Sequence, residues 1–323
     1  MKILTADIGG TNTRLALVSR DGGRWRVGHL RRFANAGHDD FTALARRYLD
    51  DLDEHPARAC LGLAGPVRGD TVRLTNLPWT LSAPALARDL GLEAVHLLND
   101  LEALAWSLDA LAAEDLLTLQ HGRSAAAGNR ALIAAGTGLG QAGLYHDGQR
   151  WHPFASEGGH ADFAPADERG FQLQRMLAAR FGHVSWERVV SGQGLVHLYE
   201  CLLEMAGEGH PPWLEEPDAP ARVSRGALEE QDALCSEALR WFARLYGAEA
   251  GNLALKTMAL GGVYVGGGIA PKILPLLQAG GFMEGFLDKG RMRGLLEGMA
   301  VQVIRNENAA LIGLARHAEQ RPL

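Results

Sequence analysis

The first residues of the chain constrain its fold more than any other stretch. From Lys2 to Val18, two short apolar runs, Ile3 to Ile8 and Leu15 to Val18, flank a turn that is rich in glycine. Apolar runs of this length, bounded by glycine and by Asn or Thr, predict two β-strands joined in a hairpin. We therefore expect the chain to begin with a strand pair closed by an unusual turn.

This turn carries the residue types of a phosphate site. Glycines allow the backbone to come close to a ligand, and successive N–H groups in such a turn form a concavity that suits a phosphate. A carboxylate beside the turn suits Mg²⁺. A tight hairpin that binds no ligand accounts for the same residues equally well at this stage. The residues concerned are Asp7, Gly9, Gly10, Thr11 and Asn12.

The pattern of strand, glycine turn and strand recurs in the second half of the chain. The apolar run Ala131 to Ala135 leads into Gly136-Thr137-Gly138-Leu139-Gly140, and Gln141 to Tyr145 follows before Asp147-Gly148. A dinucleotide fold needs a helix directly after its glycines, and the run here is too short for one. A Walker A loop is also excluded, because no glycine run is closed by Lys-Ser or Lys-Thr.

The rest of the chain alternates strands with helical patterns, which is typical of an α/β protein. Residues 207–220 are rich in Pro, Gly and Glu and predict an exposed connection. The helix predicted over residues 228–258 is expected to bend near Gly247 or Gly251. Strands are predicted at residues 59–64, 94–98, 263–265 and 299–304, and helices at residues 39–54, 84–90, 101–111, 167–181, 195–203, 228–258, 270–278 and 306–317.

Charge and cysteine content exclude several classes of protein. The formal net charge of −6 gives no positive electrostatic field that would attract nucleic acid or an anionic membrane surface. Cys60, Cys201 and Cys235 are too few and too widely separated for a disulfide framework or a zinc set. No run approaches the roughly 18 to 20 apolar residues of a membrane helix. We expect a cytoplasmic protein with no signal peptide, no membrane and no nucleic acid among its partners.

Two strand–glycine–strand hairpins, one in each half, are what the actin-like sugar kinase superfamily uses to hold the phosphates of ATP. The chain resembles the bacterial-type glucokinases of that superfamily, ATP:glucose 6-phosphotransferases, over essentially its whole length. Each motif alone is weak, but six in the right order are specific. They are residues 7–12 (DIGGTN), 98–100 (LND), 136–140 (GTGLG), 156–160 (SEGGH), 187–192 (ERVVSG) and 266–272 (GGGIAPK).

The resemblance implies a catalytic base and a set of sugar ligands. Asp100 is implied to take the proton of the attacking sugar hydroxyl, a step that a carboxylate can perform. An Asp between a strand and a helix is also a common N-cap, and both roles can hold together. Carboxylates, an amide and an imidazole are suitable partners for hydroxyl groups. The implied sugar ligands are Asn99, Asp100, Glu157, His160 and Glu187.

Three of these side chains could also serve purposes unrelated to a sugar. Glu157 and His160 could form a metal pair with Asp162, but no further ligand cluster supports zinc. Glu187 alone would pass as a solvated helix residue. The chain also lacks the zinc-binding cysteine cluster of the other bacterial glucokinase group, so no structural zinc is implied.

The resemblance places ATP and Mg²⁺ at the glycine turns. The turn of the second hairpin is implied to meet the β- and γ-phosphates, and the turn of the first hairpin approaches them from the other side. Asp7 is implied to hold Mg²⁺, through water, because Mg²⁺ dehydrates reluctantly. A third glycine turn lets adenosine lie against bare backbone. The implied ATP ligands beyond the first hairpin are Thr137, Gly138, Gly266, Gly267 and Gly268, while Asn76 and Trp79 receive no role.

The implied fold is α/β, of the two-domain actin-like ATPase (ribonuclease H-like) class, with a cleft between the domains. Residues 1–110 with 306–323 form the smaller domain, and residues 111–305 form the larger. The implied activity is phosphorylation of D-glucose at its 6-hydroxyl in glycolysis, by a homodimer.

Three alternatives remain at this stage. One is a kinase for another hexose, such as mannose or an N-acetylated amino sugar. A second is a sugar sensor of the same fold, which the acidic charge and Asp100 disfavour. A third is a structural ATPase like actin, for which the hydroxyl-binding set has no purpose.

Overall fold

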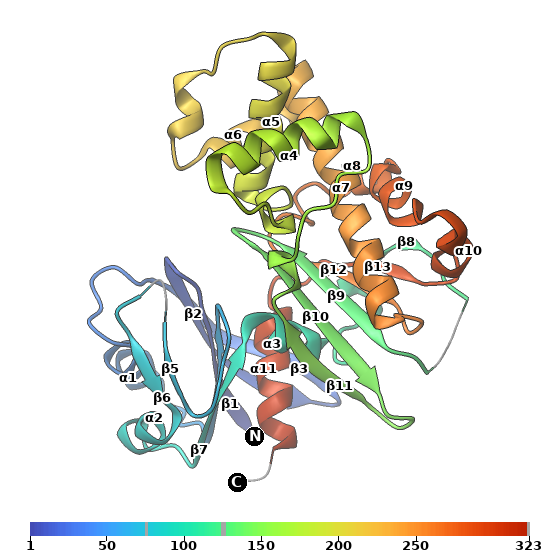
Figure 1. Ribbon diagram of the computed structural model, residues 1–323. Coiled ribbons are helices and arrows are strands. Elements are labelled where there is room, and N and C mark those ends of the chain that lie inside the picture. Colours follow the sequence, from blue (N-terminus) through green and yellow to red (C-terminus); the bar gives the residue numbers. More distant parts are fainter. Residues whose placement is uncertain (75–76, 124–126, 322–323) are drawn as a thin grey trace. The chain divides into compact units, whose positions relative to one another are not determined.

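The computed structural model describes residues 1–74, 77–123 and 127–321. The chain forms two compact units, one of Met1–Asp115 with Asn306–Leu323 and one of Leu116–Arg305. Each unit is an α/β structure built on its own β-sheet (Figure 1). Asn76 lies outside the described residues.

The first unit is built on a sheet whose five described strands follow the order β3-β2-β1-β4-β7. The first two strands pair antiparallel, which confirms the predicted hairpin, and β4 and β7 continue the sheet in parallel with β1. A small separate sheet pairs β5 with β6. The strands are β1 (Lys2–Ile8), β2 (Asn12–Asp21), β3 (Arg24–Ala34), β4 (Arg58–Leu63), β5 (Thr71–Arg73), β6 (Thr80–Ser82) and β7 (Ala94–Asn99).

Helices cover both faces of this sheet. Leu4 packs in a core shared with α1 and α2, whereas its neighbour Ile3 packs with α3 and α11 on the opposite face. Successive strand residues point to opposite faces, and β1 is apolar almost throughout because both faces are buried. The helices are α1 (Phe41–Asp50), α2 (Ala83–Leu90), α3 (Asp100–Ser107) and α11 (Ala309–Gln320).

The second unit is built on a sheet whose described strands follow the order β11-β10-β9-β12-β13-β8. The second predicted hairpin is confirmed as β9 and β10, and β12 and β13 run parallel to β9. The strands are β8 (Leu116–Gln120), β9 (Arg130–Ala135), β10 (Leu139–His146), β11 (Trp151–Ser156), β12 (Val263–Gly266) and β13 (Val301–Ile304).

One large apolar core joins the central strands of the second unit to its helices. Ile133 and Val265 of neighbouring strands lie in this core with Phe242 of the long helix α7, drawn in orange in Figure 1. The helices are α4 (Glu168–Phe181), α5 (Gly192–Ala206), α6 (Ala219–Leu228), α7 (Ala233–Thr257), α8 (Leu274–Gln278), α9 (Gly281–Leu287) and α10 (Arg293–Leu296).

The expected single helix over residues 228–258 is wrong at its start. Helix α6 ends at Leu228, and α7 begins after Asp232, whose side chain accepts a hydrogen bond from Cys235 N at 2.7 Å. This carboxylate satisfies a backbone donor that the first turn of a helix leaves without a partner. The expected exposed connection over residues 207–220 is also only partly correct, because Leu214 is buried there in a short 3₁₀ turn.

The bend expected near Gly247 or Gly251 stays a prediction, and what the structure shows at these glycines is close packing. Helix α7 runs unbroken through Gly247 and Gly251. A Cβ added at Gly247 would overlap the carbonyl oxygen of Phe282, and one added at Gly251 would approach that of Phe286 at 2.6 Å. These glycines therefore let α9 pack against the backbone of α7.

Of the strands that the sequence does not predict, β3, β8 and β11 lie at the edges of the two main sheets, and β5 and β6 form the small separate sheet. The residues of β3, β8 and β11 are mostly half-buried or exposed. An edge strand needs no continuous apolar run, so the pattern that indicates central strands is missing here. Within the described residues, no helix combines the length and the apolar character that crossing a membrane requires.

Burial of His317 on α11 makes the stability of the chain depend on pH. Arg321 Nε donates to His317 Nε2 at 3.2 Å, and the rings of His96 and Trp106 pack against its imidazole. Burial, with the charge of Arg321, lowers the pKa of His317 from 6.5 to about 4. Between these two values the unfolded chain binds more protons than the folded chain.

We therefore expect the free energy of unfolding to fall by about 3 kcal/mol as the pH drops from 6.5 to 4, while it is unaffected by this group above 6.5. Urea unfolding across this pH range measures the loss. His317→Gln, which keeps an acceptor for Arg321, should show a clearly shallower pH dependence. An equal slope in the two proteins would contradict the assignment.

Candidate functional site

The predicted site residues of the first unit gather at one edge of its sheet. Ile8, Leu63 and Asn99 are neighbours in the register of the three parallel strands β1, β4 and β7. The carboxyl ends of parallel strands are where ligands bind in α/β folds. The first glycine turn and the Asn99-Asp100 pair therefore lie at the same edge.

The first glycine turn is held by a residue that sequence reasoning missed. Asn35, just beyond β3, donates from Nδ2 to Gly9 O at 2.8 Å, and its backbone N–H donates to Thr11 O at 2.9 Å. Thr13 Oγ1 donates to Asn35 Oδ1 at 2.7 Å. Asn35 is buried. Because these bonds engage the carbonyls of the turn, its shape is fixed before any ligand binds.

Asp7 occupies the end of β1 beside this turn. Its side chain is 30% exposed, and Arg14 Nη1 lies 3.9 Å from its Oδ2. Burial raises the pKa of Asp7, and the charge of Arg14 counteracts part of this rise. Arg14 also donates to the carbonyl of Glu307 at 2.8 Å and to Oδ1 of Asn308. The site thus contains a partly accessible carboxylate whose position is tied to the start of α11.

Asn99 and Asp100 share the N-terminus of α3. Asn99 Oδ1 accepts from the N–H groups of Leu101 and Glu102 at 3.0 and 3.2 Å, so Asn99 is the N-cap and Asp100 is the first residue of the helix. Asn99 Nδ2 donates to Gly65 O at 3.1 Å. Asp100 Oδ1 accepts from Leu101 N at 2.8 Å.

A half-buried carboxylate with one oxygen fixed in this way is held in a defined direction, as a proton acceptor must be. The N-cap role that the sequence allows for Asp100 belongs to Asn99.

The two glycine turns of the second unit also lie side by side. Ala134 of β9 is the neighbour of Gly266 of β12, and the N–H of Ile269 donates to Ala135 O at 3.2 Å. Gly267 has a φ of +83°, and an added Cβ there would overlap Ala135 O. Only glycine suits this position, which brings residues 266–268 against the end of β9.

Tyr246 of α7 holds the ends of these two strands together. Its hydroxyl accepts from Ala135 N at 3.0 Å and donates to Gly266 O at 3.1 Å. The ring is completely buried, and burial raises the pKa of its hydroxyl. Sequence reasoning missed this residue, because a tyrosine in a long apolar helix carries no signal that distinguishes it from a core residue.

The structure brings Glu157, His160 and Glu187 together next to the second hairpin. His160 Nδ1 lies 3.9 Å from Glu187 Oε1, and His160 Nε2 lies 4.0 Å from Glu157 Oε2. Glu187 Oε2 accepts from the N–H of Leu139 at 2.9 Å, directly beyond Thr137 and Gly138. Glu157 and His160 are largely exposed, so their polar atoms can reach a ligand.

Behind this group, a buried polar network underlies the segment that carries Glu157 and His160. Gln141 Nε2 donates to Glu249 Oε1 at 2.7 Å, and Asn252 Nδ2 donates to Glu249 Oε2 at 2.9 Å. Gln141 Oε1 lies so close to Gly158 that an added Cβ would overlap it. Burial raises the pKa of Glu249, and the bonds from Asn252 and Gln141 counteract part of this rise.

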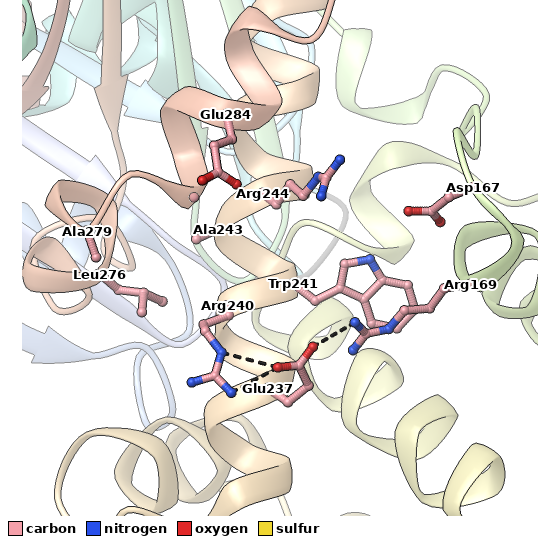
Figure 2. A pocket seen from close by; sticks show the side chains of 11 residues that line it. Asp167, Arg169, Glu237, Arg240, Trp241, Ala243, Arg244, Leu276, Ala279 and Glu284 are labelled. Carbon is pink, nitrogen blue, oxygen red and sulfur yellow. Dashed lines mark hydrogen bonds and ion pairs between the residues drawn. The ribbon is translucent and has the colours of Figure 1, made fainter.

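A separate cavity of about 340 Å³ lies between α4, α7, α8 and α9 (Figure 2). Glu237 accepts from Arg169 at 2.7 Å and from Arg240 at 2.9 Å, and the guanidinium of Arg169 lies 4.0 Å above the ring of Trp241. Its described lining includes none of the predicted site residues. Two arginines share Glu237 at its centre, and the predicted site residues lie elsewhere.

Among the described residues, no three of the types His, Cys, Asp and Glu lie close enough to form a metal site by themselves. Mg²⁺ usually takes one or two protein carboxylates and completes its shell with water and phosphate oxygens. Asp7, a partly exposed carboxylate beside a phosphate-type turn, fits that pattern.

Comparison with known proteins identifies the family of the chain. A family model described as glucokinase matches residues 4–321. A glucokinase from a Synechocystis strain is 41% identical, and the match covers 99% of this chain and 98% of the relative. The chain belongs to the glucokinase family.

Solved structures agree with this assignment. A glucokinase from an Antarctic psychrotroph superimposes with a TM-score of 0.87 at 32% identity, covering 99% of each chain. A ROK family glucokinase from Streptomyces griseus, in complex with glucose and AMPPNP, has a TM-score of 0.67 at 21% identity and covers 99% of this chain and 100% of that one. The expected α/β fold of the actin-like ATPase class is therefore confirmed.

We expect Glu249→Ala to lower the free energy of unfolding by about 2–4 kcal/mol, because it leaves the buried amide of Gln141 and the half-buried amide of Asn252 without their acceptor. Urea unfolding at pH 7 measures the loss. Glu204→Ala, at an exposed position on α5, is the control and should cost about 0.5 kcal/mol or less. Equal losses in the two variants would show that the network contributes nothing.

Proposed function

We propose that the chain transfers the γ-phosphoryl group of ATP to the 6-hydroxyl of D-glucose, as the name of its family indicates. The observation that carries this proposal is the gathering of Glu157, His160 and Glu187 beside the turn that holds Thr137 and Gly138. Carboxylates accept hydrogen bonds from sugar hydroxyls, and an imidazole can donate or accept. A phosphate-binding turn and a hydroxyl-binding group so close together suit a sugar and a nucleotide that react with each other.

In this proposal Asp100 is the general base and Asn99 a further sugar ligand. A phosphoryl transfer demands positioning, charge neutralisation and an acceptor for the hydroxyl proton. The hydrogen bond from Leu101 N to Oδ1 holds the Asp100 carboxylate in a defined direction, as a proton acceptor requires. In this proposal the two compact units are the two domains of the enzyme. The proposal also requires that residues of both domains act on the same substrates.

The glycine turns are the proposed ATP site. Residues 10–12 and 137–138 would offer backbone N–H groups to the phosphates, and residues 266–268 bare backbone to the adenosine. Gly9 N donates to Asn12 O at 3.0 Å, so Gly9 would contribute the close approach of its backbone. The AMPPNP complex of the Streptomyces griseus protein supports an ATP site on this fold. Asp7 would hold Mg²⁺ together with phosphate oxygens, and the ion would neutralise charge on the transferred group.

Substitution of Asp100 tests the proposed mechanism. We expect Asp100→Asn, which keeps an acceptor for Leu101 N but cannot take a proton, to lower kcat by about 10²- to 10⁴-fold. A coupled assay with glucose and Mg-ATP measures this, and an unchanged melting temperature shows that the fold is intact. Near-normal turnover would remove Asp100 from the mechanism. The same assay with mannose and N-acetylated amino sugars tests the substrate.

Location in the cytoplasm and assembly as a homodimer are further parts of the proposal, which rest on the family resemblance. Sedimentation of the purified protein at several concentrations gives its oligomeric state directly.

A further inference from the structure

We infer that Glu187 has a second role: through Leu139 it positions the phosphate turn of the second hairpin, and it thereby couples sugar binding to ATP binding inside the second unit. This inference rests on the proposed function, which makes Glu187 a sugar ligand. The inference adds that one side chain connects the proposed sugar site with the proposed phosphate site.

The two oxygens of the Glu187 carboxylate face different parts of the site. Oε2 accepts from Leu139 N at 2.9 Å, and a Cβ added at Gly138 would overlap this oxygen. Oε1 lies 3.9 Å from Nδ1 of His160. One carboxylate therefore touches both the backbone of the phosphate turn and a proposed sugar ligand.

Backbone contacts tie the rest of the turn to the same segments. Gly192 N donates to Gly136 O at 2.8 Å, and Ser191 Oγ donates to the carbonyl of Glu187 at 2.7 Å. On the other side, an added Cβ at Gly159 would overlap Leu139 O. The turn is thus held between the residues that follow Glu187 and those that precede His160, and it cannot move independently of either.

The hydrogen bond to Glu187 also determines which backbone N–H groups of the turn can bind a phosphate. The N–H of Leu139 is engaged by the carboxylate and the N–H of Gly136 donates to Gly138 O at 2.8 Å, so the N–H groups of Thr137 and Gly138 are the ones proposed to bind a phosphate. Moving the carboxylate away from Leu139 would release this donor and change the shape of the turn. A sugar that fixes Glu187 therefore also fixes the turn.

Linkage makes this effect reciprocal. If glucose orders Glu187, ATP binds a turn that is already ordered, and the affinity for one ligand rises in the presence of the other by the same factor. Coupling between two sites typically amounts to roughly 5- to 150-fold in affinity. We expect glucose to raise the affinity for AMPPNP within this range.

Two glycines of the same turn provide a matched pair of variants. In Gly138→Ala the new Cβ displaces Glu187 Oε2, whereas in Gly136→Ala the new Cβ has no atom within 4 Å. Gly138→Ala should raise the dissociation constant for glucose, measured by calorimetry without nucleotide, about 10-fold or more. Gly136→Ala should change it by less than about 2-fold, although both substitutions lie in the ATP turn.

The coupling itself is measured as the ratio of the AMPPNP dissociation constants without and with glucose. This ratio should fall towards 1 in Gly138→Ala and in Glu187→Ala. In a double-mutant cycle, Gly138→Ala should add little to the glucose dissociation constant once Glu187 is already alanine, because it acts through that side chain. Melting temperatures and circular dichroism confirm that each variant is folded.

The possible failures are distinguishable. If Glu187→Ala leaves glucose binding unchanged, Glu187 is not a sugar ligand and that part of the proposed function fails. If Glu187→Ala weakens glucose binding but Gly138→Ala behaves like Gly136→Ala, the coupling is refuted while the proposed function stands. Full additivity in the double-mutant cycle would refute it as well.

Discussion

Parallel strand pairing is the constraint on which both halves of the candidate site depend. Hydrogen bonding in register makes β1, β4 and β7 end at one edge, and it does the same for β9 and β12. Each strand end then passes into a turn that contains glycine or into a helix N-terminus. Residues distant in sequence, such as Gly9 and Asn99, therefore lie at the same edge of the sheet, with β4 between their strands.

The parts of the structure that could be predicted are those whose cause is local. Apolar runs and glycines determine the two hairpins. The predicted site residues followed from short motifs, each read at one place in the chain. Where a motif includes its own turn, as in residues 136–138, the strand, turn and strand could be anticipated from the sequence.

The parts that could not be predicted depend on contacts between segments far apart in the sequence. Asn35 holds a turn 26 residues away, and Gln141 meets its partner Glu249 across 108 residues. An asparagine after a charged edge strand and a glutamate inside a long helix are ordinary in sequence, and only the folded chain gives them partners. Helix α6 (Ala219–Leu228) was not predicted, and the long helix α7 was expected to begin at Leu228, before its cap at Asp232.

The glycines of α7 have a practical consequence for engineering heat resistance into this chain. Glycine inside a helix costs about 1 kcal/mol relative to alanine, so replacing it with alanine is a standard stabilising change. At Gly247 and Gly251, however, a methyl group would have to push α9 away from α7, and the cost of separating the two helices exceeds the gain in propensity. A search for thermostable variants should leave both positions alone.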